Sequence, residues 1–191
     1  RADYQITAKL NGNTNEIVGT DEITYTNNSP QKLSFLWLNL DQNLFKEDSR
    51  GNALVPLTGS RNGAQGQVFD GGNKIKSVKV ISGGKTKTET VAKYIVTDTR
   101  MQIFLPQELA AKGGSVKIKI EFSFIAPFEG SDRMGVLETK NGKIFTIAQW
   151  YPRMCVYDDV RGWNTAPYLG ASEFYLEYGD FVVKLTVPGN L

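Results

Sequence analysis

The residue types that most often do chemistry are scarce in this chain. None of its 191 residues is histidine, and Cys155 is its single cysteine. A Ser-His-Asp triad, a Cys-His dyad and any histidine-bearing zinc site are therefore excluded within the chain. One cysteine also excludes an intrachain disulfide and a cysteine-rich zinc site. Cys155 is interpreted as a buried or half-buried apolar thiol.

Two short motifs look reactive but fit turns better. Asp158 and Asp159 are neighbouring carboxylates, which can share a proton or bind a hard cation. Neighbours in a strand point to opposite faces, and no calcium-loop spacing accompanies them, so a turn or loop is predicted. The run Gly-Gly-Lys-Thr at 83–86 ends like a phosphate-binding loop. Because Lys79 stands where the first glycine of that motif belongs, this run is predicted to form a hairpin tip.

The segment 149–178 is unusually aromatic. It holds two of the three tryptophans and five of the eight tyrosines of the chain. Its weak periodicity indicates loop structure, and buried apolar surface stabilises a fold by about 25 cal/mol per Å². We therefore expect these rings to pack on the chain's own sheet, on a partner domain or on a ligand.

The composition limits the class of protein and of partner. Hydrophobic residues make up 40% of the chain and charged residues 22%, which is typical of a globular fold. The formal net charge of +2 argues against nucleic-acid binding through bulk electrostatics. No run of about 18 apolar residues occurs, so no membrane span is predicted. The sequence starts without Met and ends just after a strand-like run, and we expect it to be a piece of a longer protein.

Alternating apolar and polar residues predict many strands. The strongest run is 116–124, which is rich in β-branched and aromatic residues. Similar runs predict strands at 4–10, 17–26, 33–40, 75–81, 94–97, 101–105, 143–149 and 181–187. Asn141-Gly142 is expected to form a type I′ turn at the tip of a hairpin.

Helical signals are few. The run 106–113 begins with Pro and ends at Gly, which predicts a helix of one or two turns, and 44–49 predicts another short turn. Residues 48–73 are rich in Gly, Asn and Ser and are interpreted as a long loop over the sheet. The predicted fold class is an all-β, mostly antiparallel β-sandwich with one or two very short helices.

Near its carboxyl end the sequence resembles a known family. The matching residues are Ala-Gln-Trp-Tyr-Pro at 148–152, Tyr-Asp-Asp-Val-Arg-Gly-Trp-Asn at 157–164, Glu-Phe-Tyr-Leu-Glu-Tyr-Gly-Asp-Phe at 173–181 and Val-Lys-Leu-Thr-Val-Pro at 183–188. They resemble the amino-terminal domain of the gluzincin zinc aminopeptidases, the metallopeptidase family of aminopeptidase N and leukotriene A hydrolase, in particular its bacterial branch. The resemblance implies that 1–191 is one saddle-shaped β domain that precedes a catalytic domain.

The resemblance also implies how function is divided between the two domains. Zinc and its His-Glu-x-x-His helix belong to the catalytic domain after residue 191, so this chain is expected to hold no catalytic residue, metal ligand or cofactor. The family's amino-terminal domain commonly offers a Gln-x-Glu loop to the substrate. Gln149 matches the glutamine that lines the substrate pocket, and Tyr151 stands where the glutamate that helps to hold the free α-amino group belongs. A phenol accepts a hydrogen bond but carries no charge at neutral pH.

These implications give a first interpretation and two alternatives. The first is a non-catalytic domain that covers the active-site cleft of a periplasmic or secreted zinc aminopeptidase, with Gln149 and Tyr151 binding the amino terminus of a peptide substrate. An alternative is a free-standing module for glycan or peptide, with Trp150, Trp163 and Tyr168 stacking on the ligand. A third is a scaffold from a family member that has lost its zinc site. A His-Glu-x-x-His motif further along the polypeptide would distinguish the first from the others.

Overall fold

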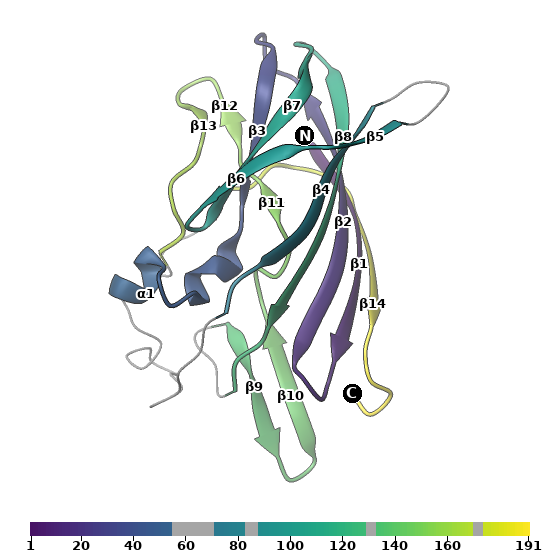
Figure 1. Ribbon diagram of the computed structural model, residues 1–191, viewed down its shortest axis with the longest axis vertical. Coiled ribbons are helices and arrows are strands. Elements are labelled where there is room, and N and C mark those ends of the chain that lie inside the picture. The colour runs from purple at the N-terminus through teal and green to yellow at the C-terminus, as the bar shows by residue number, and fades with distance from the viewer. Residues whose placement is uncertain (55–70, 83–87, 129–132, 170–173) are drawn as a thin grey trace.

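The computed structural model describes residues 1–54, 71–82, 88–128, 133–169 and 174–191. Its largest element is a six-stranded sheet with the strand order β14-β1-β2-β8-β4-β5 (Figure 1). Neighbouring strands are antiparallel except β1 and β14, which run parallel. The strands are β1 Ala2–Asn11, β2 Glu16–Asn27, β4 Lys74–Ser82, β5 Thr88–Val91, β8 Gly114–Ile125 and β14 Phe181–Thr186.

A second, four-stranded antiparallel sheet has the order β11-β3-β7-β6. Its strands are β3 Leu33–Asn39, β6 Lys93–Thr97, β7 Arg100–Leu109 and β11 Arg153–Met154. Two hairpins accompany the sheets, namely β9 Met134–Thr139 with β10 Gly142–Ile147, and β12 Tyr157–Asp158 with β13 Gly162–Trp163. Two short helical segments are described, the 3₁₀ helix η1 Asp41–Phe45 and the α-helix α1 Arg50–Leu54. The predicted all-β, mostly antiparallel sandwich is confirmed.

The alternation that predicted a strand at 116–124 appears as the two faces of β8. Ile118, Ile120 and Phe122 are buried, while the charged side chains between them are only half-buried. β8 pairs with β2 along the whole length of both strands, which places Ile23 beside Ile118. Each fully buried side chain of this kind stabilises the fold by about 1.5–3 kcal/mol. The apolar face of β8 therefore fixes the register of the large sheet.

The main core lies between the two sheets. Buried side chains of the small sheet pack against those of the large one, and they include Leu36, Leu38, Met101, Ile103, Ile23, Ile118 and Ile120. A second cluster lies where the β9–β10 hairpin covers the far end of β8, and it includes Phe122, Phe124, Met134 and Val136. Figure 1 shows this hairpin at the opposite end of the molecule from the β12–β13 hairpin. The two clusters support the segment that joins β10 to β11.

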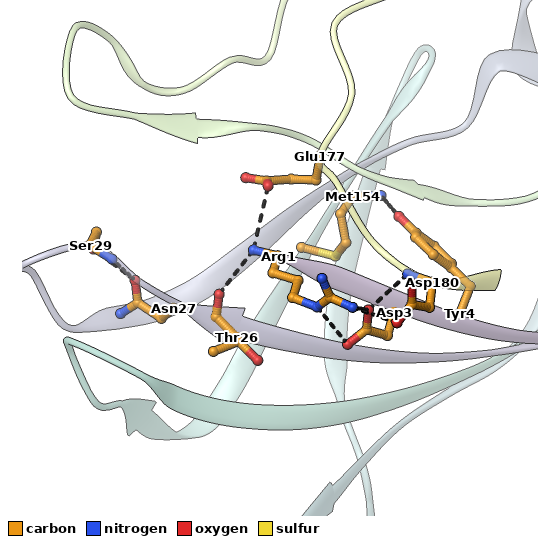
Figure 2. A network of polar contacts seen from close by, with 9 residues as sticks. All are labelled: Arg1, Asp3, Tyr4, Thr26, Asn27, Ser29, Met154, Glu177 and Asp180. Carbon is orange, nitrogen blue, oxygen red and sulfur yellow. Dashed lines mark hydrogen bonds and ion pairs between the residues drawn. The ribbon is translucent and has the colours of Figure 1, made fainter.

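Strand β14 forms one edge of the large sheet and is tied to β1 by polar contacts (Figure 2). The Arg1 guanidinium donates hydrogen bonds to the carboxylates of Asp3, at 3.2 Å, and Asp180, at 2.6 Å. The Asp180 amide donates in turn to Asp3, at 2.9 Å. The ring of Phe181 stacks on Tyr4 with 4.6 Å between centroids. β14 therefore extends the buried face of β1 to the edge, where its own apolar side chains are exposed.

The helix predicted at 106–113 is wrong, because β7 continues as a strand through Pro106. Proline is tolerated there because the β6 partner ends at the pair Lys93–Phe104 and the register with β3 shifts just beyond it. Gly113, with φ of 106°, belongs instead to the turn between β7 and β8. Its amide donates to the carbonyl of Asn27, at 2.8 Å. Gly113 is therefore part of a turn between two strands and not the end of a helix.

The β9–β10 hairpin was predicted correctly, but its turn differs from the prediction. Thr139 pairs with Gly142, so Lys140 and Asn141 are the central residues of the turn. Of residues 139–142, only Gly142 has a positive φ, of 121°, and it is not a central residue of the turn. A type I′ turn requires a positive φ at both central positions. The turn is therefore shifted by one residue from the predicted Asn-Gly pair. The predicted hairpin tip at 83–86 and most of the predicted loop at 48–73 lie outside the described residues.

Candidate functional site

Gln149 lies two residues beyond β10, where the chain bends toward β11. Its backbone has φ of 48°, which a residue other than glycine rarely adopts. Gln42, a buried residue of η1, holds this bend by donating its side-chain amide to the carbonyls of Ala148, at 2.8 Å, and Gln149, at 3.2 Å. The Ala148 amide donates to the carbonyl of Arg133, at 2.9 Å. The bend is therefore fixed from two sides, which explains how its unfavourable φ persists.

The side chain of Gln149 lies near Tyr168, a later residue of the aromatic segment. Burial raises the pKa of the Tyr168 hydroxyl, and a hydrogen-bonding interaction with the Gln149 side chain opposes that rise. Tyr168 is held by its own backbone amide, which donates to the buried Thr99 hydroxyl at 2.9 Å. Its ring lies 5.3 Å from the ring of Phe174. The side chain of Gln149 thus lies near a loop residue that is bonded to the turn between β6 and β7.

A buried ion pair underlies this loop and was missed by the sequence analysis. The Asp41 carboxylate accepts hydrogen bonds from both Nε, at 2.8 Å, and a terminal nitrogen of Arg153. Asp41 is 2% exposed and Arg153 is 5% exposed. Burial raises the pKa of Asp41, and the Arg153 guanidinium opposes that rise. A charge flanked by the apolar Pro152 and Met154 signals a buried partner, but the sequence does not reveal that the partner lies 112 positions away.

The Arg153 guanidinium also contacts the ring of Phe174, with 4.7 Å from Cζ to the centroid. Arg133 approaches the same ring at 5.9 Å. We call Arg133, Gln149, Arg153, Tyr168 and Phe174 the Gln149 cluster. Its members come from the base of β9, the bend after β10, the strand β11 and the aromatic segment, so the fold brings together residues that are distant in sequence.

Tyr151, the second predicted binding residue, has different neighbours. Its ring makes edge contacts with Trp150, at 5.3 Å, with Tyr4, at 5.6 Å, and with Phe181, at 6.1 Å. Burial raises the pKa of its hydroxyl, so Tyr151 stays neutral at physiological pH. The contacts of Tyr151 therefore lie with β1 and β14, whereas those of the Gln149 side chain lie with Tyr168.

The tryptophans of the aromatic segment pack on the chain's own sheets. Trp150 contacts both core clusters and lies 6.5 Å from the ring of Phe122. Trp163 lies 5.1 Å from Tyr157 and 5.8 Å from Tyr25. Both are half-buried. The stacking surface that the binding-module alternative requires is therefore not formed by Trp150 or Trp163.

The remaining candidate residues behave as predicted. Cys155 is fully buried, and burial raises the pKa of its thiol to about 12. Asp158 accepts hydrogen bonds from the amides of Val160, at 3.0 Å, and Arg161, at 2.8 Å, within the β12–β13 turn. Those donors, the Arg161 amide above all, lower the pKa of its carboxyl. The Asp158–Asp159 pair therefore belongs to a turn.

Within the part of the chain that the structure describes, no group of three Cys, Asp or Glu residues lies close enough together to hold a metal ion. No described helix has the length and apolar character needed to cross a membrane. A cavity of about 560 Å³ lies between the carboxyl-terminal end of β2 and the β12–β13 hairpin, and it shares no lining residue with the Gln149 cluster.

Comparison with known proteins gave matches among solved structures alone. No protein-family model matches the sequence, and no curated protein matches it. The fold is similar to an M1 zinc metallopeptidase from Deinococcus radiodurans, with 11% identity, a TM-score of 0.38, and coverage of 66% of this chain and 20% of that one. A mutant of that enzyme bound to a Tyr-Ser-Ala substrate matches with 10% identity, a TM-score of 0.40 and coverage of 66% and 21%. A two-domain M1 zinc metallopeptidase mutant bound to L-tryptophan matches with 10% identity, a TM-score of 0.40 and coverage of 68% and 22%. The chain thus spans about a fifth of the length of these structures.

Proposed function

We propose that this chain is the non-catalytic amino-terminal domain of a zinc-dependent aminopeptidase, which covers the active-site cleft and lines a substrate subsite. The observation that carries the proposal is the position of Gln149. The residue that matches the family's pocket glutamine is held at a fixed bend by Gln42, and its side chain lies near the Tyr168 hydroxyl. A rigid support of this kind is what a substrate-binding amide requires.

The proposed roles follow from the side chains. The Gln149 amide can donate and accept hydrogen bonds, which suits the backbone of a peptide. Tyr151 is proposed to shape the neighbouring subsite with its ring, since a neutral phenol cannot replace a carboxylate as the partner of an α-ammonium group. The chain supplies no histidine, so the proposed zinc and its chemistry belong to a catalytic domain of the same polypeptide.

Exposed apolar side chains support the presence of a partner domain. Phe181, Val183 and Leu185 of β14 are 45–63% exposed. Tyr178, just before this strand, is 89% exposed. Apolar side chains gathered along one edge are typical of a protein interface. The proposed partner is the catalytic domain, and the proposed location is periplasmic or secreted, as the bacterial-branch resemblance suggests.

The test of the proposal is an activity assay of the parent polypeptide. We expect release of amino-terminal residues from short peptides, loss of this activity with a chelator, and its return with zinc. Gln149→Ala should lower kcat/KM by roughly tenfold to a hundredfold while the melting temperature is unchanged. Gln5→Ala, on the exposed face of β1, is the matched control and should have no effect. A parent without a His-Glu-x-x-His motif or without chelator-sensitive activity would disprove the assignment.

A further inference from the structure

The charges of the Gln149 cluster do not balance. Arg153 and Arg133 both lie against the Phe174 ring, with their Cζ atoms 4.7 Å and 5.9 Å from its centroid. Arg153 is compensated by the buried Asp41 carboxylate, which it contacts through two nitrogens. Arg133 is exposed, and no carboxylate of the described residues forms an ion pair with it. Within those residues the cluster therefore carries one uncompensated positive charge.

Arg133 is fixed beside Gln149 by the backbone. Its φ of 65° is a left-handed conformation, and its carbonyl accepts a hydrogen bond from Ala148, the residue before Gln149. The Phe174 ring lies 5.9 Å from the Arg133 Cζ atom and 5.3 Å from the Tyr168 ring. The hydroxyl of that tyrosine interacts with the Gln149 side chain. The exposed guanidinium and the Gln149 amide are therefore presented together at one corner of the molecule.

Among the described residues of this corner, no unpaired carboxylate is available to an ammonium group. Tyr151, which stands at the expected carboxylate position, is neutral and packs on Tyr4 and Phe181. The Asp41 carboxylate is buried and occupied by Arg153. A positive corner with two kinds of N–H donor suits an anion, and a guanidinium matches the two oxygens of a carboxylate.

We propose that the Gln149 cluster binds a carboxylate of a peptide, with Arg133 supplying the charge and Gln149 a neutral hydrogen bond. The proposal rests on the proposed function in taking the ligand to be a peptide. Arg153 and Phe174 position the binding residues. The ion pair with Asp41 fixes the Arg153 guanidinium, which packs on the Phe174 ring. Arg133 packs on the same ring. The bound group is an acidic side chain or the carboxyl terminus of a short peptide.

The proposal is tested by binding of three matched dipeptides to the 191-residue chain. N-acetyl-Ala-Ala carries a carboxylate, its carboxamide is neutral, and Ala-Ala amide carries an ammonium group. The readouts are calorimetry and the NMR signals of the Trp150 indole and of the arginine Nε groups. We expect the first dipeptide to bind about tenfold more tightly than the other two, as a charge-assisted hydrogen bond would give, and to bind more weakly as salt is added.

Arg133→Gln and Arg161→Gln change the net charge equally, so comparing them shows whether carboxylate binding depends on Arg133 in particular. Arg133→Gln should weaken binding of N-acetyl-Ala-Ala by about tenfold, and Arg133→Lys should restore part of it. Arg161→Gln, in the exposed β12–β13 turn, is the control and should bind as the unaltered chain does. The proposal is overturned if N-acetyl-Ala-Ala and its carboxamide bind equally well. It is also overturned if N-acetyl-Ala-Ala shows no saturable binding, or if its binding is unchanged in Arg133→Gln.

The outcome separates this inference from the proposed function. Carboxylate binding that depends on Arg133, in a chain whose parent has no peptidase activity, upholds the site and rejects the aminopeptidase. An active aminopeptidase whose isolated amino-terminal chain prefers Ala-Ala amide upholds the enzyme and rejects the carboxylate site. The acidic side-chain source is distinguished by N-acetyl-Glu amide, which should bind as well as N-acetyl-Ala-Ala if side chains are accepted.

Discussion

Side chains in the six-stranded sheet and side chains in the Gln149 cluster meet their partners in different ways. In the sheet, apolar residues of β2 and β8 face one another along a regular backbone ladder. In the cluster, a few polar residues from separate loops hold each other, as Gln42 holds Gln149 and Asp41 holds Arg153. A sheet of this kind loses stability in proportion to the apolar volume removed, whereas a polar cluster fails when one partner is lost. The candidate site is therefore the more fragile part of the molecule.

The largest expected effect breaks the cluster at its buried ion pair. Arg153→Met should lower the free energy of unfolding by about 3–5 kcal/mol, because the Asp41 carboxylate is left buried without a partner. Denaturant unfolding measures the loss. The double variant Asp41→Leu, Arg153→Met removes both charges and should regain most of it. A double variant as unstable as the single one would show that shape, rather than charge, dominates.

A smaller effect is expected from an aromatic residue that joins the segment 149–178 to the sheet. Trp163→Ala should lower the free energy of unfolding by about 2–3 kcal/mol, below the roughly 3–5 kcal/mol of a fully buried ring, since Trp163 is half-buried against Tyr25 and Tyr157. Thermal melting and the binding of N-acetyl-Ala-Ala are measured together. Loss of binding with unchanged melting would return Trp163 to the role of a ligand contact.

The sheet has one polar exception, and it predicts a dependence on pH. Asp21 is fully buried on the inner face of β2 beside Ile6 and Ile120, and neither carboxyl oxygen has a hydrogen-bond partner among the described residues. Burial raises the pKa of Asp21 well above its ordinary value of 3.8, and the neighbouring Glu22 adds to the rise. The neutral acid therefore suits the fold. The stability that the neutral Asp21 contributes is fully present below the pKa of the unfolded chain. It is lost as the pH rises through the raised pKa of the folded state.

Asp21→Asn should remove that loss. The variant is expected to exceed the wild type by about 1–3 kcal/mol in free energy of unfolding near neutral pH, because a neutral amide costs less to bury than a carboxylate. The difference should shrink toward zero or reverse at pH values below 3.8. Denaturant unfolding across a pH series tests this, with Asp159→Asn in the exposed turn as control. A difference that does not change with pH would contradict the neutral state.

The smallest expected effect loosens the cluster without breaking it. Gln42→Ala removes two hydrogen bonds from the carbonyls of residues 148 and 149, which should lower the free energy of unfolding by about 1–2 kcal/mol. Hydrogen exchange of the Ala148 amide should become faster, while exchange in β8 stays the same. Faster exchange in both places would mean that Gln42 supports the whole fold rather than the bend at Gln149.

The sheet was predictable from sequence because its information is local. The alternation at 116–124 states which face is buried, and β8 follows it. Pro106 misled the helix prediction because its tolerance depends on where β6 ends, which is a property of a neighbouring strand. For the site, the resemblance selected Gln149, but Asp41 and Gln42 were missed because they come from η1, more than a hundred residues earlier. Single polar contacts between residues so far apart leave no repeating pattern in the sequence from which they could be predicted.

The parallel pairing of β1 with β14 has a consequence for the order of folding. Tyr4 pairs with Phe181, so this edge of the sheet joins positions 177 residues apart. The β1–β2 hairpin needs only a short loop and can form early, whereas the ladder between β1 and β14 must wait for almost the whole chain. The intervening segment carries Gln149, Tyr168 and Phe174, and docking of β14 closes it into a loop. The candidate site is therefore expected to assemble last, after the sheets that support it, and a pulse-labelling experiment should find the Tyr168 amide protected later than that of Ile120.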